Sequence, residues 1–220
     1  MFIRTIQYCF EMEPYKKDTT ASYDIDPLFF EKKFRESFEQ FGRDEATLFI
    51  SKLFGKKVLD IGCGPGIYLD FFRENGLDAV GIDISDKFLE TCFKKGLNVR
   101  KMDMENILFW PYSFDGIWAG SVLLHLQRKR IPALVKSWAK LLKPSGIIWV
   151  LVKEGEREGF DLSEREDNSK RWFTYFTENE LREYFSPFFN EEYFYRRDSG
   201  NGVIWLEFLF RLKPDLNQTK

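Results

Sequence analysis

The sequence predicts an α/β fold: one domain built on a doubly wound, mostly parallel sheet. Short buried strands alternate with amphipathic helices from Val58 to Val152. The first of these strands carries a carboxylate near its end and is followed by three closely spaced glycines, a pattern typical of a strand, a tight turn and a helix N-terminus. A chain of 220 residues is long enough for one such domain with a sizeable core.

The glycine-rich turn is the segment Asp60-Ile61-Gly62-Cys63-Gly64-Pro65-Gly66. Glycine lets the backbone approach a ligand where a Cβ would collide, and the amides that open the next helix are free to face a polar group. A phosphate-binding loop is excluded because the turn does not end in Gly-Lys-Ser or Gly-Lys-Thr. The dinucleotide fingerprint G-x-G-x-x-G also differs from the G-x-G-x-G found here. A turn that binds no ligand is the remaining alternative.

Two further carboxylates follow the next predicted strands. Asp83 lies near the end of the strand 78–85, and Asp103 follows the short run 97–102. Because parallel strands end at one edge of the sheet, we expect these carboxylates to lie beside Asp60. A carboxylate at the end of the second strand can accept hydrogen bonds from ribose hydroxyls. Both nicotinamide and methionine-derived cofactors contain a ribose, so Asp83 alone does not distinguish them. Asp103 taken alone also fits a turn or cap residue.

The glycine turn with Asp60 before it resembles the first motif of class I S-adenosylmethionine-dependent methyltransferases. The resemblance continues through Trp118-Ala119, the block Leu123-Leu124-His125-Leu126 and the helix break Lys143-Pro144-Ser145-Gly146. The resemblance covers most of the chain from about Tyr23 onward. Within the family, the chain is most similar to small bacterial and archaeal methyltransferases of type 11. Ser145 stands where these proteins often have glycine.

The resemblance implies a Rossmann-like sheet of seven strands, one of them antiparallel, under a helical N-terminal cover. It implies S-adenosyl-L-methionine as cofactor, S-adenosyl-L-homocysteine as product, and no metal. Asp103 would bind the adenine amino group, with Met104 or Ile84 against the ring. The implied cofactor-binding residues are Asp60, Gly62, Cys63, Gly64, Gly66, Asp83, Ile84, Asp103, Met104 and Ser121.

We divide the chain into a leader (1–22) and a methyltransferase domain (23–212). Within the domain we expect a helical cover (23–55), a cofactor-binding core (56–152), a lid with a pocket wall (153–176) and a C-terminal helix and hairpin (177–212). Residues 1–12 fit an extra strand, a loose leader, or translation that starts upstream of Met12. In the cover, phenylalanines at helical spacing predict a buried face: Phe30, Phe34, Phe38 and Phe41.

Several later elements have clear signals. A helix from Arg130 to Leu142 and a buried strand from Ile147 to Val152 follow the fourth strand, 114–121. Thr177-x-x-Glu180 predicts a capping box that opens a helix ending at Phe185. Two strands, near 191–196 and 203–210, are joined by the turn-forming segment 198–202.

The segment 154–171 is rich in charges of both signs and contains two glycines. It is either a solvated loop or a lid at the ligand edge of the sheet. The aromatic residues after it suit a pocket wall, so we name Trp172 and Tyr175, together with Tyr23, as substrate contacts.

His125 is the only histidine and follows the fourth strand, near the expected transfer point. It is either the general base or a structural, hydrogen-bonded residue. Cys63 is either a nucleophile or a small residue that fits the loop.

The bulk properties limit the partners. The formal charge is −2, and basic residues form no stripe, which argues against direct nucleic acid binding. Three cysteines without metal spacing indicate a reducing compartment, and there is no apolar run of membrane-spanning length and no signal peptide. We therefore expect a cytoplasmic monomer or homodimer, with no membrane association.

The expected activity is transfer of a methyl group to oxygen, nitrogen or carbon of a small-molecule acceptor. Two alternatives stay open. One is methylation of tRNA or protein with the help of a partner subunit. The other is a cofactor-binding protein without catalytic activity.

Overall fold

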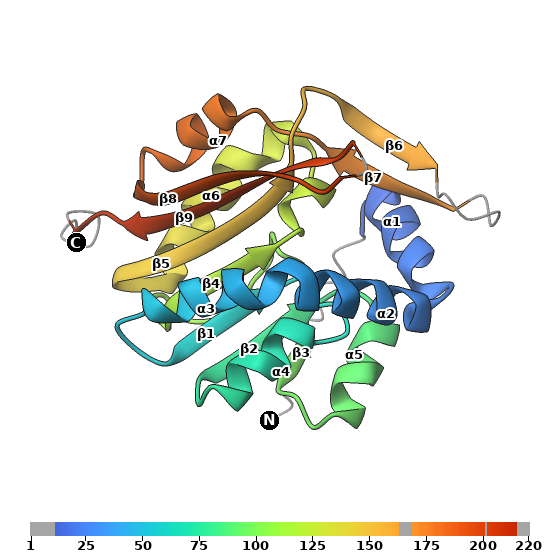
Figure 1. Cartoon of the computed structure of the whole chain (residues 1–220), viewed down its shortest axis with the longest axis horizontal. Helices are drawn as coiled ribbons and strands as arrows, with labels where there is room; N and C mark the ends of the chain where they lie inside the picture. The colour runs from blue at the N-terminus through green and yellow to red at the C-terminus, as the bar shows by residue number, and fades with distance from the viewer. Residues whose placement is uncertain (1–11, 163–168, 201, 215–220) are drawn as a thin grey trace, which may run out of the picture.

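The computed structural model describes residues 12–162, 169–200 and 202–214 (Figure 1). Its main sheet has seven strands in the order β3-β2-β1-β4-β5-β9-β8. Their bounds are β1 Lys57–Ile61, β2 Asp78–Asp83, β3 Val99–Lys101, β4 Phe114–Gly120, β5 Leu142–Lys153, β8 Phe189–Asp198 and β9 Ile204–Leu212. Strands β1 to β5 are parallel, and β9 is antiparallel to both β5 and β8. The predicted sheet with one antiparallel strand is confirmed.

Helices pack on both faces of this sheet, as the doubly wound prediction requires (Figure 1). Their bounds are α1 Pro14–Asp24, α2 Pro27–Ser37, α3 Arg43–Ser51, α4 Ile67–Glu74, α5 Asp86–Lys94, α6 Ile131–Leu141 and α7 Glu178–Phe185. A π-helical turn, Phe38–Gly42, joins α2 to α3. None of the helices in the described ranges is long and apolar enough to cross a membrane.

Strand β5 shows how the sequence builds the two layers of the core. Ile148, Val150 and Val152 pack into the cluster that contains α6 and α7, while the alternate residues pack toward α3 and α4. On the second face Trp149 stacks on Trp118 of β4, with ring centres 5.2 Å apart. Both strands are buried along nearly their whole length, which explains their nearly continuous apolar sequences.

The helical cover begins earlier in the chain than the sequence suggested. Residues 14–22, which we assign to the leader, belong to α1, so that boundary is wrong; residues 1–11 lie outside the described part. The signal in the sequence is weak here because most residues of α1 are polar, including three of its four buried residues, Lys16, Thr19 and Ser22. The predicted buried face of α2 is confirmed for Phe30, and Phe38 in the π-helical turn is buried too.

The segment expected to be a loop or lid contains strands. β6 (Glu158–Leu162) pairs antiparallel with β7 (Lys170–Thr174), and the hairpin lies beside α1 (Figure 1). The amide of Trp172 donates a hydrogen bond of 2.9 Å to the Thr19 hydroxyl of α1. Residues 163–168 of the predicted lid are outside the described residues. The predicted capping box at Thr177 is confirmed, since its side chain and that of Glu180 satisfy each other's backbone amides.

One buried ionic group lies between α3 and the β8–β9 hairpin. Arg197 donates to Glu45 at 2.8 Å and to Glu207 at 2.5 Å, and both carboxyl groups are buried. Burial, followed by the charge of Glu207, raises the pKa of Glu45 to about 8. The Arg197 guanidinium thus donates hydrogen bonds to two carboxyl groups, and Glu45 keeps its proton at neutral pH.

We predict that Glu45→Gln makes the protein more stable than the wild type by an amount that grows as pH rises. The native wild type holds a proton that the unfolded chain releases, so its stability falls between about pH 4.5 and pH 8, by up to about 1.4 kcal/mol per pH unit. Urea unfolding at several pH values measures the difference.

The control is Glu192→Gln, because Arg211 lowers the pKa of Glu192. Its stability difference from the wild type stays flat from about pH 5 to 8. A flat difference for Glu45→Gln over the same range would contradict the protonated state of Glu45.

Candidate active site

The glycine turn after β1 uses each glycine for a different physical reason. Gly62, Gly64 and Gly66 all have positive φ, at 71°, 52° and 81°. A Cβ on Gly62 would lie 2.4 Å from Val122, and one on Gly66 would lie 2.5 Å from Leu97. A Cβ on Gly64 would meet no atom closer than 3.9 Å, the nearest belonging to Phe34 and Phe88. The outer glycines are needed for packing, while a Cβ at the middle one would have room and make only ordinary van der Waals contact with Phe34 and Phe88.

Asp83 holds this turn in place from the end of β2. Its Oδ2 accepts the amide of Gly64 and its Oδ1 accepts the amide of Ser85, both at 2.8 Å. Burial raises the pKa of Asp83, and the amides of Ser85 and Gly64 oppose that shift. Each carboxylate oxygen still has a lone pair for another donor, so Asp83 can also receive hydroxyl groups.

Asp60, just before the turn, has a buried side-chain oxygen without a hydrogen-bond partner among the described residues. Its side chain is 2 % exposed, and Oδ2 has no hydrogen-bond partner among the residues that the structure describes. Burial, followed by the charge of Asp83, raises the pKa of Asp60 well above its usual range. A buried carboxyl oxygen without a partner is costly, so a ligand with a cationic or N–H donor fits this position.

Asp103, the third predicted carboxylate, forms an ion pair with a residue of α1. Lys16 donates to Asp103 at 2.5 Å and to Glu105 at 2.6 Å, and its side chain is buried. The amide of Glu105 donates to the other oxygen of Asp103. The sequence offered no signal for Lys16, because the residue belongs to the segment we assigned to the leader.

The two residues expected to pack against an adenine ring lie at this edge in different settings. Ile84 follows Asp83 and is half-buried. The Met104 carbonyl accepts the indole N–H of Trp138, and the Met104 side chain packs against the main core.

His125 forms a chain of hydrogen bonds with two other elements. Its Nδ1 lies 2.7 Å from the carbonyl oxygen of Trp172, and its Nε2 lies 2.9 Å from the hydroxyl of Tyr23. A carbonyl can only accept, so Nδ1 carries the proton and Nε2 accepts from Tyr23. Burial lowers the pKa of His125 to about 3, and the charges of Arg171 and Lys153 add to this effect. His125 is therefore neutral near pH 7.

Helix α1 and the start of α2 connect this chain of hydrogen bonds to the glycine turn. The ring of Tyr23 contacts Phe30, Phe34 and Phe88, and Phe34 also lies against Gly64. Asp24 accepts the Ser85 hydroxyl at 2.5 Å, next to Asp83. Tyr23 thus lies between His125 and the aromatic residues that cover the turn.

The other predicted residues lie around this centre. The Trp172 carbonyl accepts the hydrogen bond from His125 Nδ1, and the centre of its ring lies 5.3 Å from that of Tyr15. The Tyr175 hydroxyl is engaged by Asp161 and Arg157 within the hairpin region. Ser121 follows β4 with φ of 62°, a strained conformation for a residue with a side chain, and its amide donates to Leu151.

Cys63 does not have the surroundings of a nucleophile. It is buried, and a hydrogen bond with Cys92 together with burial raises the pKa of its thiol well above the usual range. A thiol that keeps its proton is a poor nucleophile. The interpretation of Cys63 as a small residue that fits the loop is therefore favoured.

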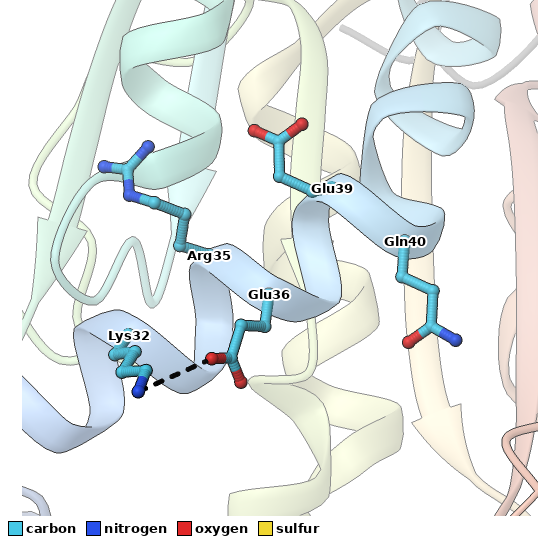
Figure 2. Close-up of a pocket in the computed structure, with 5 residues that line it drawn as sticks. All are labelled: Lys32, Arg35, Glu36, Glu39 and Gln40. Atoms are coloured by element: carbon cyan, nitrogen blue, oxygen red, sulfur yellow. Dashed lines mark ion pairs between the residues drawn. The ribbon is translucent and has the colours of Figure 1, made fainter.

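A surface hollow elsewhere on the cover has no part in this arrangement. It is lined by Lys32, Arg35, Glu36, Glu39 and Gln40, all on the solvent side of α2 and the π-helical turn (Figure 2). These side chains are exposed, and none of the predicted site residues lines the hollow.

The sequence of this chain is similar to those of known methyltransferases. Residues 59–150 match a family model described as a methyltransferase domain. The ubiquinone biosynthesis O-methyltransferase of Idiomarina loihiensis is 36% identical over 104 residues, which are 44% of this chain and 42% of that protein. The phosphoethanolamine N-methyltransferase 1 of Zea mays is 32% identical over 135 residues, 56% of this chain and 26% of that protein. The chain thus spans less than half the length of these curated relatives.

Solved structures share the fold over most of the chain. The 1,6-didemethyltoxoflavin-N1-methyltransferase of Burkholderia thailandensis was solved with bound 1,6-didemethyltoxoflavin and S-adenosylhomocysteine. It has a TM-score of 0.68 at 19% identity, and the match covers 92% of this chain and 91% of that chain. A methyltransferase of Archaeoglobus fulgidus has a TM-score of 0.65 at 19% identity, covering 84% of this chain and 98% of its own. At this identity the likeness shows the fold alone.

We predict that Gly64→Ala and Gly62→Ala separate ligand binding from folding. Alanine at Gly64 adds a methyl group to the space beside Phe34 and Phe88, where we place the ligand, so affinity for S-adenosylhomocysteine, measured by calorimetry, should fall at least tenfold. The left-handed backbone there costs on the order of 1 kcal/mol of stability. Alanine at Gly62 has the same backbone cost and in addition collides with Val122, so its unfolding temperature should fall further. Unchanged affinity in a folded Gly64→Ala protein would contradict the role of this space.

Proposed function

We propose that this chain, whose residues 59–150 are a class I S-adenosylmethionine-dependent methyltransferase domain, transfers a methyl group from S-adenosylmethionine to a small-molecule acceptor. The observation that supports the proposal most directly is the buried Oδ2 of Asp60, two residues before the glycine turn, which has no hydrogen-bond partner among the described residues. The ammonium group of the cofactor is a donor that satisfies this oxygen. The loop has no lysine or other cation suited to a pyrophosphate.

The remaining carboxylates suit the rest of the cofactor. Asp83 has lone pairs left for the two ribose hydroxyls after it has received the amides of Gly64 and Ser85. Asp103 can accept the adenine amino group if Lys16 shares it with Glu105. Ile84 and Met104 would flank the ring, and Ser121 would lie near the methionine portion.

The chain's own residues position the acceptor and receive its proton. When bound, the cofactor supplies a methyl group on a sulfonium centre that is open to in-line displacement. The Tyr23 oxygen can take a proton from the acceptor while its own proton passes to His125 Nε2. Trp172 keeps the other ring nitrogen protonated, so that Nε2 stays available. The aromatic cover excludes water from this point.

The test is conversion of S-adenosylmethionine to S-adenosylhomocysteine with a panel of small acceptors, with tRNA and with protein as separate arms. We expect turnover with a small acceptor. Turnover with tRNA or protein alone, or binding without any turnover, would contradict the proposal and favour one of the two alternatives.

Asp60→Asn gives a sharp prediction for the same site. Asparagine keeps the volume but removes the buried carboxylate, so affinity for S-adenosylmethionine should fall at least tenfold while stability stays equal or rises. Calorimetry and thermal unfolding measure the two effects. A stability loss without a loss of affinity would show that Asp60 is structural.

Tyr23→Phe and His125→Asn test the proton path. Asparagine retains a donor for the Trp172 carbonyl, and phenylalanine retains the aromatic contacts, so each change removes one hydrogen bond. We expect each to lower kcat by about 10²-fold and the double variant to be no slower than either, with cofactor affinity within twofold of the wild type. Additive losses would contradict a shared path, and unchanged turnover would leave His125 as a structural residue.

A further inference from the structure

Lys153, the last residue of β5, lies in an aromatic setting at the ligand edge of the sheet. Its Nζ is 4.0 Å from the ring centre of Phe173, 5.7 Å from that of Tyr175 and 5.9 Å from that of Trp205. The side chain is half-buried. Burial, followed by the charge of Arg171, lowers the pKa of this lysine.

Arg171 of β7 has a similar environment on the neighbouring side. Its guanidinium carbon is 5.3 Å from the ring centres of Tyr23, Phe30 and Phe173. The Nε atom is buried and has no hydrogen-bond partner among the described residues. Phe173 therefore has a cation near its ring from both Lys153 and Arg171, and the two charges repel each other.

Neither of these cations forms an ion pair with a carboxylate in the described ranges, although most arginines of the chain do. Such pairs are Arg128–Glu180, Arg130–Glu13, Arg157–Asp161, Arg182–Glu191, Arg196–Glu154, Arg197–Glu45 and Arg211–Glu192. Asp161, a carboxylate that acts on Lys153, is held by Arg157 at 2.5 Å and by the Tyr175 hydroxyl at 2.8 Å.

Two partly desolvated like charges without a counter-ion are unfavourable unless something else pairs with them. Aromatic rings compensate for part of this cost through cation–π contacts. They supply no hydrogen-bond acceptor for the Arg171 Nε or the lysine ammonium. An oxyanion supplies both the charge and the acceptors.

We propose that Lys153 and Arg171 bind an oxyanion, a carboxylate or phosphate, on the methyl acceptor. The inference rests on the proposed methyl transfer and specifies the class of acceptor. Arg171 contacts Tyr23, and Phe173 contacts His125 with ring centres 5.0 Å apart, so the anion site adjoins the proposed proton path. The acceptor is therefore small, with its anionic group only a few bonds from its nucleophilic atom.

Binding of an anion at Lys153 and Arg171 also affects His125 as a proton acceptor. The charges of Arg171 and Lys153 both lower the pKa of His125 in the free protein. An anion that neutralises them makes the imidazole a better proton acceptor only when the acceptor is present.

The test begins with binding, so that it does not depend on finding the acceptor. Inorganic phosphate and benzoate serve as probes on the protein saturated with S-adenosylhomocysteine, with chloride at equal ionic strength as the reference. At least one of the two should raise the unfolding temperature of the wild type, and the one that does identifies the anion type. Lys153→Met and Arg171→Met should lose at least tenfold in probe affinity, and Lys153→Arg should retain it.

The matched control is Lys170→Met. Lys170 is also on β7 and also lies over an aromatic ring, that of Phe160 at 4.5 Å, but it is exposed and paired with Asp18. It should respond to the probes as the wild type does. Loss of a repelling cation should leave the free Lys153→Met and Arg171→Met proteins as stable as the wild type or more stable. Reduced stability together with an unchanged probe response would show that these cations are only structural.

Turnover supplies the second arm, with acceptor pairs that differ only in the anion: phosphoethanolamine against ethanolamine, and 3,4-dihydroxybenzoate against catechol. The anionic member should be preferred at least tenfold in kcat/KM, and Lys153→Met should remove that preference. A wild type that shows no response to either probe beyond that to chloride would overturn the proposal. Failure to bind S-adenosylhomocysteine at all would instead overturn the proposed function.

Discussion

The hydrogen bonds of Asp83 organise the whole ligand edge of this protein. One carboxylate at the end of β2 accepts the amide of Gly64 from the glycine turn and the amide of Ser85 from the start of α5. Because β1 and β2 are parallel neighbours, both segments leave the sheet at the same level, and a single side chain can bridge them. This bridge holds the glycine turn and the start of α5 against each other.

Helix α1 completes the site from outside the sheet. It supplies Lys16 to Asp103, Tyr23 to His125 and Asp24 to Ser85, and it also holds the β6–β7 hairpin through Thr19. These are polar contacts between segments far apart in sequence. They add to the ring contacts that Tyr15 and Tyr23 of α1 form with Trp172 and with Phe30, Phe34 and Phe88.

The edge is divided into two electrostatic halves. Asp60, Asp83 and Asp103, the carboxylates to which we assign the cofactor, lie on the side of β1, β2 and β3. Lys153 and Arg171 lie on the side of β5 and β7, where an anion is satisfied. Tyr23 and His125 lie between the halves, at the point where a methyl group would pass from one ligand to the other. This division supports a reaction between two ligands of different charge.

The sequence by itself determined the sheet, its alternating helices and the carboxylates at the strand ends. Those features depend on local periodicity, on glycines in a tight turn and on the geometry of parallel strands, all of which are legible in the chain. The tertiary structure decided the rest. Lys16 reaches Asp103, Tyr23 reaches His125, and Arg171 and Lys153 meet around Phe173 only after distant segments have packed together. The low pKa of His125 has the same origin, because burial and the charge of residues remote in sequence produce it.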